Sequence, residues 1–182
     1  MKKITIFIVA TISIFLAAFT VYSVQADENK PPEIVSSFST KFNRKLRNRT
    51  FNLRKAASQI DGKVLLPGQT FSFNETVGNA SKQNGYKKAQ IFVNGKKRQG
   101  YGGGICQISS TLYNACLNAG MRIDERHSHS RRVDYVERGK DAATSYEGYD
   151  FKFTNTLSFP ILIRITVKNN YVTADLSKIY TK

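Results

Sequence analysis

The chain has 182 residues, with 28 lysines and arginines against 13 acidic residues, so its formal net charge is +15 at pH 7. This length is enough for one domain with a hydrophobic core. The basic residues are spread along the chain and are not interleaved with an aromatic platform, which argues against a nucleic-acid-binding protein.

The N-terminus is typical of a secretory signal peptide. Lys2 and Lys3 precede an apolar run over residues 4–22, and small residues lead up to Ala26. An uncleaved anchor is the alternative, because the run approaches the ~20 residues that span a bilayer. In either case we expect the rest of the chain to lie outside the cytoplasm, in the cell wall or secreted. Membrane contact is expected only through this segment, if it is not cleaved.

The charge of the remaining chain favours anionic cell-wall polymers as partners over nucleic acid. Without the two lysines of the signal, residues 27–182 keep 26 basic residues against all 13 acids, a net charge of +13. A solvated basic surface that only keeps the protein in solution explains this charge equally well.

Residues 27–47 are expected to be a linker with a basic lead-in, and residues 48–182 one folded domain. Pro31-Pro32 lies in a polar stretch, and a basic run follows over residues 41–54. Asn52 is expected to cap a short helix over residues 53–60 that ends at Asp61-Gly62.

The rest of the chain predicts mainly short strands. We expect strands at 64–66 and 70–73, and a hairpin over 89–99 with a type I′ turn at Asn94-Gly95. Residues 122–135 alternate in polarity as in a strand, and residues 149–178 are rich in strand-forming residues around Asn169-Asn170. Together with the helix described next, this predicts an α+β fold: a single domain with an antiparallel sheet and one principal helix that carries a cysteine at its N-terminus.

Both cysteines lie in that helix, predicted over residues 105–119 and ended by Gly120. Ten residues of helix separate Cys106 from Cys116 by ~15 Å, too far for a disulfide, which needs Cα atoms within ~7 Å. Cys116 lies on the apolar stripe and is expected to be a buried small hydrophobe. Cys106 lies off this stripe, on the face of Ser109, Ser110 and Tyr113.

Cys106 is the candidate nucleophile. A thiol in the first turn of a helix has a lowered pKa, because unpaired N–H groups and the helix dipole stabilise the thiolate. The preceding Gly102, Gly103 and Gly104 permit unusual backbone angles and leave room for a substrate chain. The same N–H groups could hold an oxyanion during acyl transfer. The alternative is a glycine-rich turn followed by a buried thiol.

A nucleophilic thiol needs an acid–base partner, and the only histidines are His127 and His129. In a strand both rings would point to one face, so either could be the base. Arg126 and Arg131 could hold a substrate carboxylate, and Asp141 could orient a histidine or bind a substrate amine. No zinc-binding motif is present, so neither a metal nor another cofactor is expected.

The blocks GYGGGICQISSTLYNACLNAG (residues 100–120) and ERHSHSRRVDYVERGKDAATSY (residues 125–146) resemble the VanW family. The resemblance extends from about residue 48 to residue 160 and beyond. Members are exported or membrane-anchored, and the family is named from a vancomycin-resistance cluster. Some members are regarded as cysteine-dependent L,D-transpeptidases of peptidoglycan.

The resemblance implies that Cys106 attacks the third-residue carbonyl of a peptidoglycan stem tetrapeptide and releases D-Ala. An amine on a second stem peptide would then take the acyl group, giving a 3–3 cross-link. A histidine of the 126–130 block would be the base, and the Gly102–Gly104 turn would line the cleft. With water in place of the amine, the same site would be a peptidase. A non-catalytic cell-wall peptide-binding protein related to glycopeptide resistance is the second hypothesis.

Overall fold

The computed structural model describes residues 30–93 and 95–180, so the expected signal at residues 1–26 lies outside the described residues. In chain order the elements are β1 (Glu33–Lys41), α1 (Arg47–Ile60), β2 (Lys63–Leu65), β3 (Thr70–Ser72), α2 (Phe73–Val77), β4 (Lys88–Val93), β5 (Lys96–Tyr101), α3 (Ile105–Asn118), β6 (Arg122–Glu125), β7 (Lys152–Thr154), β8 (Ile161–Lys168) and β9 (Tyr171–Lys178). Within this part of the chain, no helix is long and apolar enough to cross a membrane.

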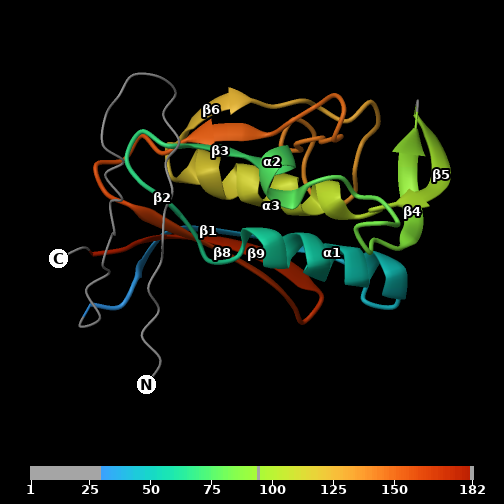
Figure 1. Cartoon of the computed structure of the whole chain (residues 1–182), viewed down its shortest axis with the longest axis horizontal. Coiled ribbons are helices and arrows are strands. Elements are labelled where there is room, and N and C mark those ends of the chain that lie inside the picture. Colours follow the sequence, from blue (N-terminus) through green and yellow to red (C-terminus); the bar gives the residue numbers. More distant parts are fainter. Residues whose placement is uncertain (1–29, 94, 181–182) are drawn as a thin grey trace, which may run out of the picture.

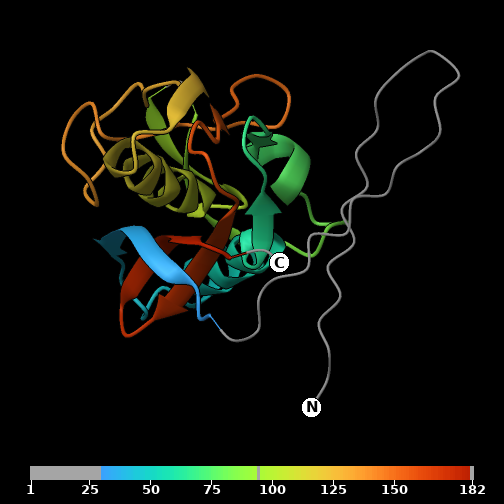
Figure 2. The ribbon, with the colours of Figure 1, turned by 90° about the vertical axis from the view of Figure 1, so that its left-hand side faces the viewer.

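The fold is a single small α+β domain, as predicted, but its strands form three antiparallel sheets. Their orders are β1-β9-β8-β2, β3-β7-β6 and β4-β5. Helix α3 lies between the four-stranded and the three-stranded sheet, and α1 packs on β8 beside it (Figures 1 and 2). Both α1 and α3 have 14 residues, so the expectation of one principal helix on one sheet is too simple.

The prediction of a linker with a basic lead-in over residues 27–47 is wrong where the first strand lies. Residues 33–41 form β1, which pairs with β9 from Glu33 opposite Lys178 to Lys41 opposite Tyr171. Its buried face carries hydroxyl groups: Ser36 donates to the backbone oxygen of Ala115 and Thr40 bonds to Thr111, both in α3. These bonds satisfy the polar groups that β1 buries, so the strand needs no run of large apolar residues.

Helix α1 begins at Arg47, six residues before the predicted start, so Asn52 is not its cap. Asn52 is fully buried instead, and its amide bonds to the backbone oxygens of Lys87 and Gly103. Its Oδ1 accepts from the N–H of Lys87. A buried asparagine with these partners ties α1 to the segment before β4 and to the turn before α3.

Helix α3 follows the prediction closely. It begins at Ile105, and eleven of its fourteen residues are buried because it has a sheet on either side. Gly120 adopts a φ of 71°, and the N–H of Met121 bonds to the oxygen of Cys116, as in a left-handed helix end. Both cysteines are free thiols, and Cys116 is fully buried as expected.

The predicted hairpin is present as β4 and β5, although Asn94 of its turn lies outside the described residues. The predicted strands around Pro67-Gly68 are also present, as β2 and β3, and they enter different sheets. At the C-terminus, β8 and β9 pair around Asn169 and Asn170, whose φ angles of 52° and 65° are those of a tight hairpin turn.

The expected strand over residues 122–135 is wrong beyond its first part. Strand β6 ends at Glu125, and only His127 continues the pairing, through a single bridge to Ala143. Residues 128–135 form an irregular segment instead. The two histidines therefore do not project side by side from one strand, and each has its own surroundings.

Candidate active site

A broad open cleft of about 2260 Å³ runs past the start of α3. Its walls come from the segment before α1, the β4–β5 hairpin and residues 128–135 and 143–146. Pockets for small ligands occupy ~300–1,000 Å³, so this cleft suits an extended ligand. Cys106 and His129 both line it.

Cys106 is the second residue of α3 and remains partly exposed to the cleft. Its Sγ lies 3.5 Å from the backbone oxygen of Thr144 and 3.8 Å from the Thr144 hydroxyl. Within the described residues, the N–H of Cys106 has no hydrogen-bond acceptor, whereas those of Ile105 and Gln107 bond to Gly102 and Gly104. The N–H of Cys106 is therefore a free donor beside its own thiol.

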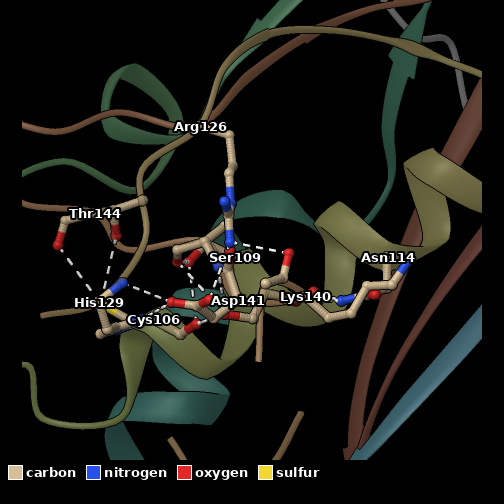
Figure 3. Close-up of polar contacts among 11 residues, drawn as sticks. Cys106, Ser109, Asn114, Arg126, His129, Lys140, Asp141 and Thr144 are labelled. Atoms are coloured by element: carbon tan, nitrogen blue, oxygen red, sulfur yellow. Dashed lines mark hydrogen bonds and ion pairs between the residues drawn. The ribbon is translucent and has the colours of Figure 1, made fainter. Parts of the chain in front are cut away.

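His129 is the histidine that the structure brings to the thiol. The two side chains lie close enough that each shifts the pKa of the other. Its Nδ1 lies 2.7 Å from Oδ2 of Asp141. Because Nδ1 faces the carboxylate, Nε2 is the ring nitrogen left for the sulfur. Figure 3 shows Thr144, His129, Cys106 and Asp141 gathered in this way.

Asp141 is almost fully buried, and both of its carboxylate oxygens have partners. Oδ2 accepts from the backbone N–H of His129 as well as facing its ring, and Oδ1 pairs with Arg126 at 3.0 Å. Arg126 also donates to the backbone oxygens of Gly139 and Asp141. These contacts favour an orienting role for Asp141 over contact with a substrate amine, and they direct Arg126 toward the Asp141 loop.

The charges of this group are coupled. Burial would raise the pKa of the Cys106 thiol, but the hydrogen bond and charge of His129, with Thr144, outweigh it and lower that pKa. Burial would lower the pKa of His129, but Cys106 and then Asp141 raise it. Burial would raise the pKa of Asp141, yet its bonds to His129 hold that pKa below its usual value. Cys106 and His129 thus each stabilise the charged form of the other.

The polar face of α3 holds the loop that carries Asp141 and Thr144. Ser109 donates to the backbone oxygen of Ala142 at 2.7 Å, and Ser110 accepts from the Ala142 N–H at 2.9 Å. Asn114 donates to the backbone oxygen of Lys140 at 2.7 Å. These side chains would be costly to bury without partners, so they fix the loop against the helix that bears the thiol.

His127 has other partners and does not line the cleft. Its Nε2 lies 3.0 Å from Oε1 of Glu125, and its ring stacks on Tyr149 with centroids 4.5 Å apart. Its backbone oxygen accepts from Ala143. The structure therefore brings only one of the two candidate histidines to Cys106.

The three glycines before α3 line the cleft, and their own surroundings are tight. A Cβ on Gly102 would lie 2.4 Å from Cβ of Ala80, and one on Gly103 would lie 2.5 Å from the backbone oxygen of Gln90. Gly104 has a φ of 113° and lies against Arg49. Because these residues have no side chain, the β4–β5 hairpin and α1 can pack closely against the start of α3. This packing alone requires glycine here, whether or not a substrate binds.

Arg131 lines the cleft and donates to the backbone oxygen of Gly95 at 2.9 Å. It links the irregular segment 128–135 to the tip of the β4–β5 hairpin. In the described part of the chain, no group of three or more histidine, cysteine or acidic side chains is placed to hold a metal ion.

The chain matches the family model described as VanW like protein over residues 48–177. It belongs to the VanW family. The protein YoaR of Bacillus subtilis (strain 168), which carries the name uncharacterized protein, is 47% identical over 130 residues, 71% of this chain and 43% of YoaR. Vancomycin B-type resistance protein VanW of Enterococcus faecalis (strain ATCC 700802 / V583) is 32% identical over 131 residues, 69% of this chain and 47% of that protein.

The alignments with these two curated relatives cover less than half of each relative's length. No solved structure matches the chain.

Several residues around the thiol of this VanW-family chain were not singled out from the sequence. Thr144 contacts Cys106, and Asn114 holds the Lys140 end of the loop. Tyr135 lines the cleft, and burial, with the negative charge of Cys106, raises the pKa of its phenol, which therefore keeps its proton. A buried polar face on α3 was the available signal, because Ser109, Ser110 and Asn114 share a helical face with Cys106.

Proposed function

We propose that this VanW-family chain is an exported peptidoglycan-modifying protein, a cysteine-dependent L,D-transpeptidase that forms 3–3 cross-links through an acyl-enzyme at Cys106. The observation that carries the proposal is the order of side chains Cys106, His129 and Asp141, with the histidine between thiol and carboxylate. A nucleophile, a base and a group that orients the base are the parts that acyl transfer requires.

The proposed reaction has two steps. The Cys106 thiolate attacks the carbonyl carbon of the third residue of a tetrapeptide stem, so that a C–S bond forms and the C–N bond to D-Ala breaks. His129, protonated by the thiol, gives its proton to the departing amine. The amine of a second stem peptide then attacks the thioester, the new amide bond forms, and the sulfur leaves again as thiolate while His129 takes the amine proton.

Two donors are suited to stabilise the oxyanion of each step. The free N–H of Cys106 lies in the first turn of α3, where the helix dipole adds positive potential. The Tyr135 phenol stays protonated and lines the same cleft. The proposal assigns both to the developing negative charge.

The surroundings of the reaction are part of the proposal. The signal-like N-terminus supports an extracytoplasmic place, in the cell wall or anchored to the membrane, and the net charge of +15 supports contact with anionic wall polymers. The similarity to a protein named as a vancomycin B-type resistance protein supports a role related to glycopeptide resistance.

The test is incubation of the purified protein with tetrapeptide-stem muropeptides, followed by mass spectrometry of the intact protein and of the products. We expect an acyl adduct, released D-Ala and dimeric muropeptides with wild type and Cys116→Ala, and none with Cys106→Ala. Tripeptide without dimers would make the protein a hydrolase. Binding of the muropeptide without any adduct would contradict catalysis and favour a non-catalytic wall-binding protein.

A further inference from the structure

Arg49, from the first turn of α1, reaches the beginning of the helix that carries the thiol. A Cβ built on Gly104 would lie 3.0 Å from Cγ of Arg49 and 3.5 Å from its Nη1. Gly104 precedes Cys106 by two residues, so the guanidinium lies beside the first turn of α3. Arg49 also lines the cleft.

Gln107 fixes the direction of this guanidinium. Arg49 Nη2 donates to Oε1 of Gln107 at 2.8 Å. The Gln107 amide nitrogen donates in turn to the Thr40 hydroxyl at 3.0 Å and to the Lys41 backbone oxygen at 2.9 Å, and the residue is 1% exposed. These bonds leave no freedom to flip the Gln107 amide. Among residues 30–93 and 95–180, Gln107 Oε1 is the acceptor that the Arg49 side chain has, so its other N–H groups remain available for a ligand.

The cleft has a large excess of positive charge around Arg49. Its other basic residues are Lys41, Arg44, Lys45, Arg47, Lys97, Arg131 and Arg132, against the single acid Asp134. Among the described residues, no carboxylate lies within ion-pair distance of any of these basic groups or of Arg49. Such a cleft attracts anions, and the fixed guanidinium is the member of the set that lies beside the first turn of α3, next to Gly104 and Gln107.

We infer that Arg49 binds a carboxylate of the substrate next to the bond that Cys106 attacks, so that the preferred donor is a peptide that ends one residue beyond that bond. The inference rests on the proposed function and adds its specificity. A guanidinium can grip a carboxylate through two parallel N–H bonds, which a neutral C-terminal amide cannot match. The leaving residue of a tetrapeptide stem carries this carboxylate, and a longer or amidated stem does not place one there.

The first experiment measures alkylation of Cys106 by iodoacetate and by iodoacetamide at low ionic strength. In both reactions the thiolate forms a bond to the CH₂ carbon and iodide leaves, so only the carboxylate of the reagent differs. Cys116 is fully buried and does not compete. We expect the iodoacetate-to-iodoacetamide rate ratio to exceed that of free cysteine by about tenfold, and R49Q to remove most of this preference.

R49K and R54Q are the comparison variants. R49K keeps the charge without the two-pronged geometry and should give an intermediate ratio. Arg54 is an exposed residue of the same helix outside the cleft, so R54Q should keep the wild-type ratio. A wild-type ratio equal to that of free cysteine, or equal losses in R49Q and R54Q, would overturn the inference. Thermal unfolding of each variant shows whether a lost preference reflects a lost fold.

The second experiment compares acyl-adduct formation on a tetrapeptide stem with a free C-terminus and on the same stem with a C-terminal amide. We expect wild type to favour the free acid and R49Q to treat both alike. Equal rates in wild type would refute the role of Arg49 and leave the transpeptidase proposal standing. A raised iodoacetate-to-iodoacetamide ratio that R49Q removes, without any acyl adduct, would refute the transpeptidase proposal and leave the carboxylate site standing.

Discussion

Asp141 holds His129 at two points: its Oδ2 accepts from the backbone N–H of His129 at 2.6 Å and faces the ring Nδ1 at 2.7 Å. One carboxylate oxygen thus fixes both where the residue sits and which way its ring turns. Arg126 occupies the other oxygen and keeps the carboxylate from rotating. The ring of His129 thereby has a fixed orientation.

Asp141→Asn should lower the rate of acyl transfer by roughly 10²–10⁴, because the ring loses the acceptor that sets its tautomer and stabilises its positive charge. Initial rates of D-Ala release provide the measurement. Asp124→Asn is a suitable control, since Asp124 bonds to Arg122 and Thr154 on β6 and β7, away from the thiol. A rate for Asp141→Asn close to that of Asp124→Asn would contradict the role of Asp141.

The two histidines should differ in how they affect the thiol. The pKa of Cys106 is lowered, so alkylation by iodoacetamide should rise with pH through a midpoint below that of an ordinary thiol. His129→Gln should move the midpoint upward, because burial still opposes the thiolate while the imidazole that offset it is gone. His127→Gln should leave the midpoint in place, since His127 contacts Glu125 and Tyr149 instead. Equal shifts in both variants would show that the assignment of the base is wrong.

Substitution of Cys116 should lower the stability of the fold, whereas substitution of Cys106 should remove the reactive thiol. Cys116→Ser places a hydroxyl in a fully buried apolar position and should cost about 1–3 kcal/mol of unfolding free energy while alkylation at Cys106 continues. Cys106→Ser should abolish alkylation and change stability little, because this side chain is partly exposed. Urea unfolding and mass spectrometry of the labelled protein test both halves. A large loss of stability in Cys106→Ser would favour a mainly structural thiol.

Asn114→Ala removes the bond to the Lys140 backbone oxygen and should cost about 1–3 kcal/mol of stability. It should also slow acyl transfer, because the loop that bears Asp141 is no longer fixed to α3. Asn118→Ala provides a matched control on an exposed position of the same helix. Thermal unfolding measures the stability of both variants. Equal losses in the two would exclude a special role for Asn114.

Gly103→Ala should displace the β4–β5 hairpin, since its Cβ would lie 2.5 Å from the backbone oxygen of Gln90. Relief of this overlap should cost about 1–3 kcal/mol, measured by thermal unfolding. Gly148→Ala meets only the Ser145 hydroxyl oxygen, at 2.9 Å, and a side chain can move aside. Matching melting temperatures for the two variants would show that the glycine turn is not under packing constraint.

The sequence predicts the helix of Cys106 well, because its signals are local. Apolar residues recur at helical spacing, and Gly104 and Gly120 mark its ends. Strand β1 carries no comparable signal. It buries Ser36 and Thr40, and what makes these positions tolerable is their bonds to Ala115 and Thr111 of a helix far along the chain.

The candidate site is only partly readable from the sequence for a similar reason. The alternation over residues 122–135 resembles a strand, yet the N–H of His129 bonds to the Asp141 carboxylate and not to a neighbouring strand. Because of that bond, His129 does not continue the β-pairing that His127 makes with Ala143. The choice between the two histidines depends on a partner twelve residues away, which local periodicity does not contain.

The pairing of β1 with β9 has a mechanical consequence. Glu33 lies opposite Lys178, and the Tyr180 hydroxyl donates to Glu33 at 2.7 Å, so the chain enters and leaves the domain at one edge, at the opposite end of Figure 1 from the hairpin. The cleft is lined at the other end of β1, by Lys41, so Glu33 and Lys178 lie away from it. Tension applied across both ends would peel these antiparallel strands apart one hydrogen-bonded pair at a time, so the domain would open from this edge before the walls around Cys106 were loaded.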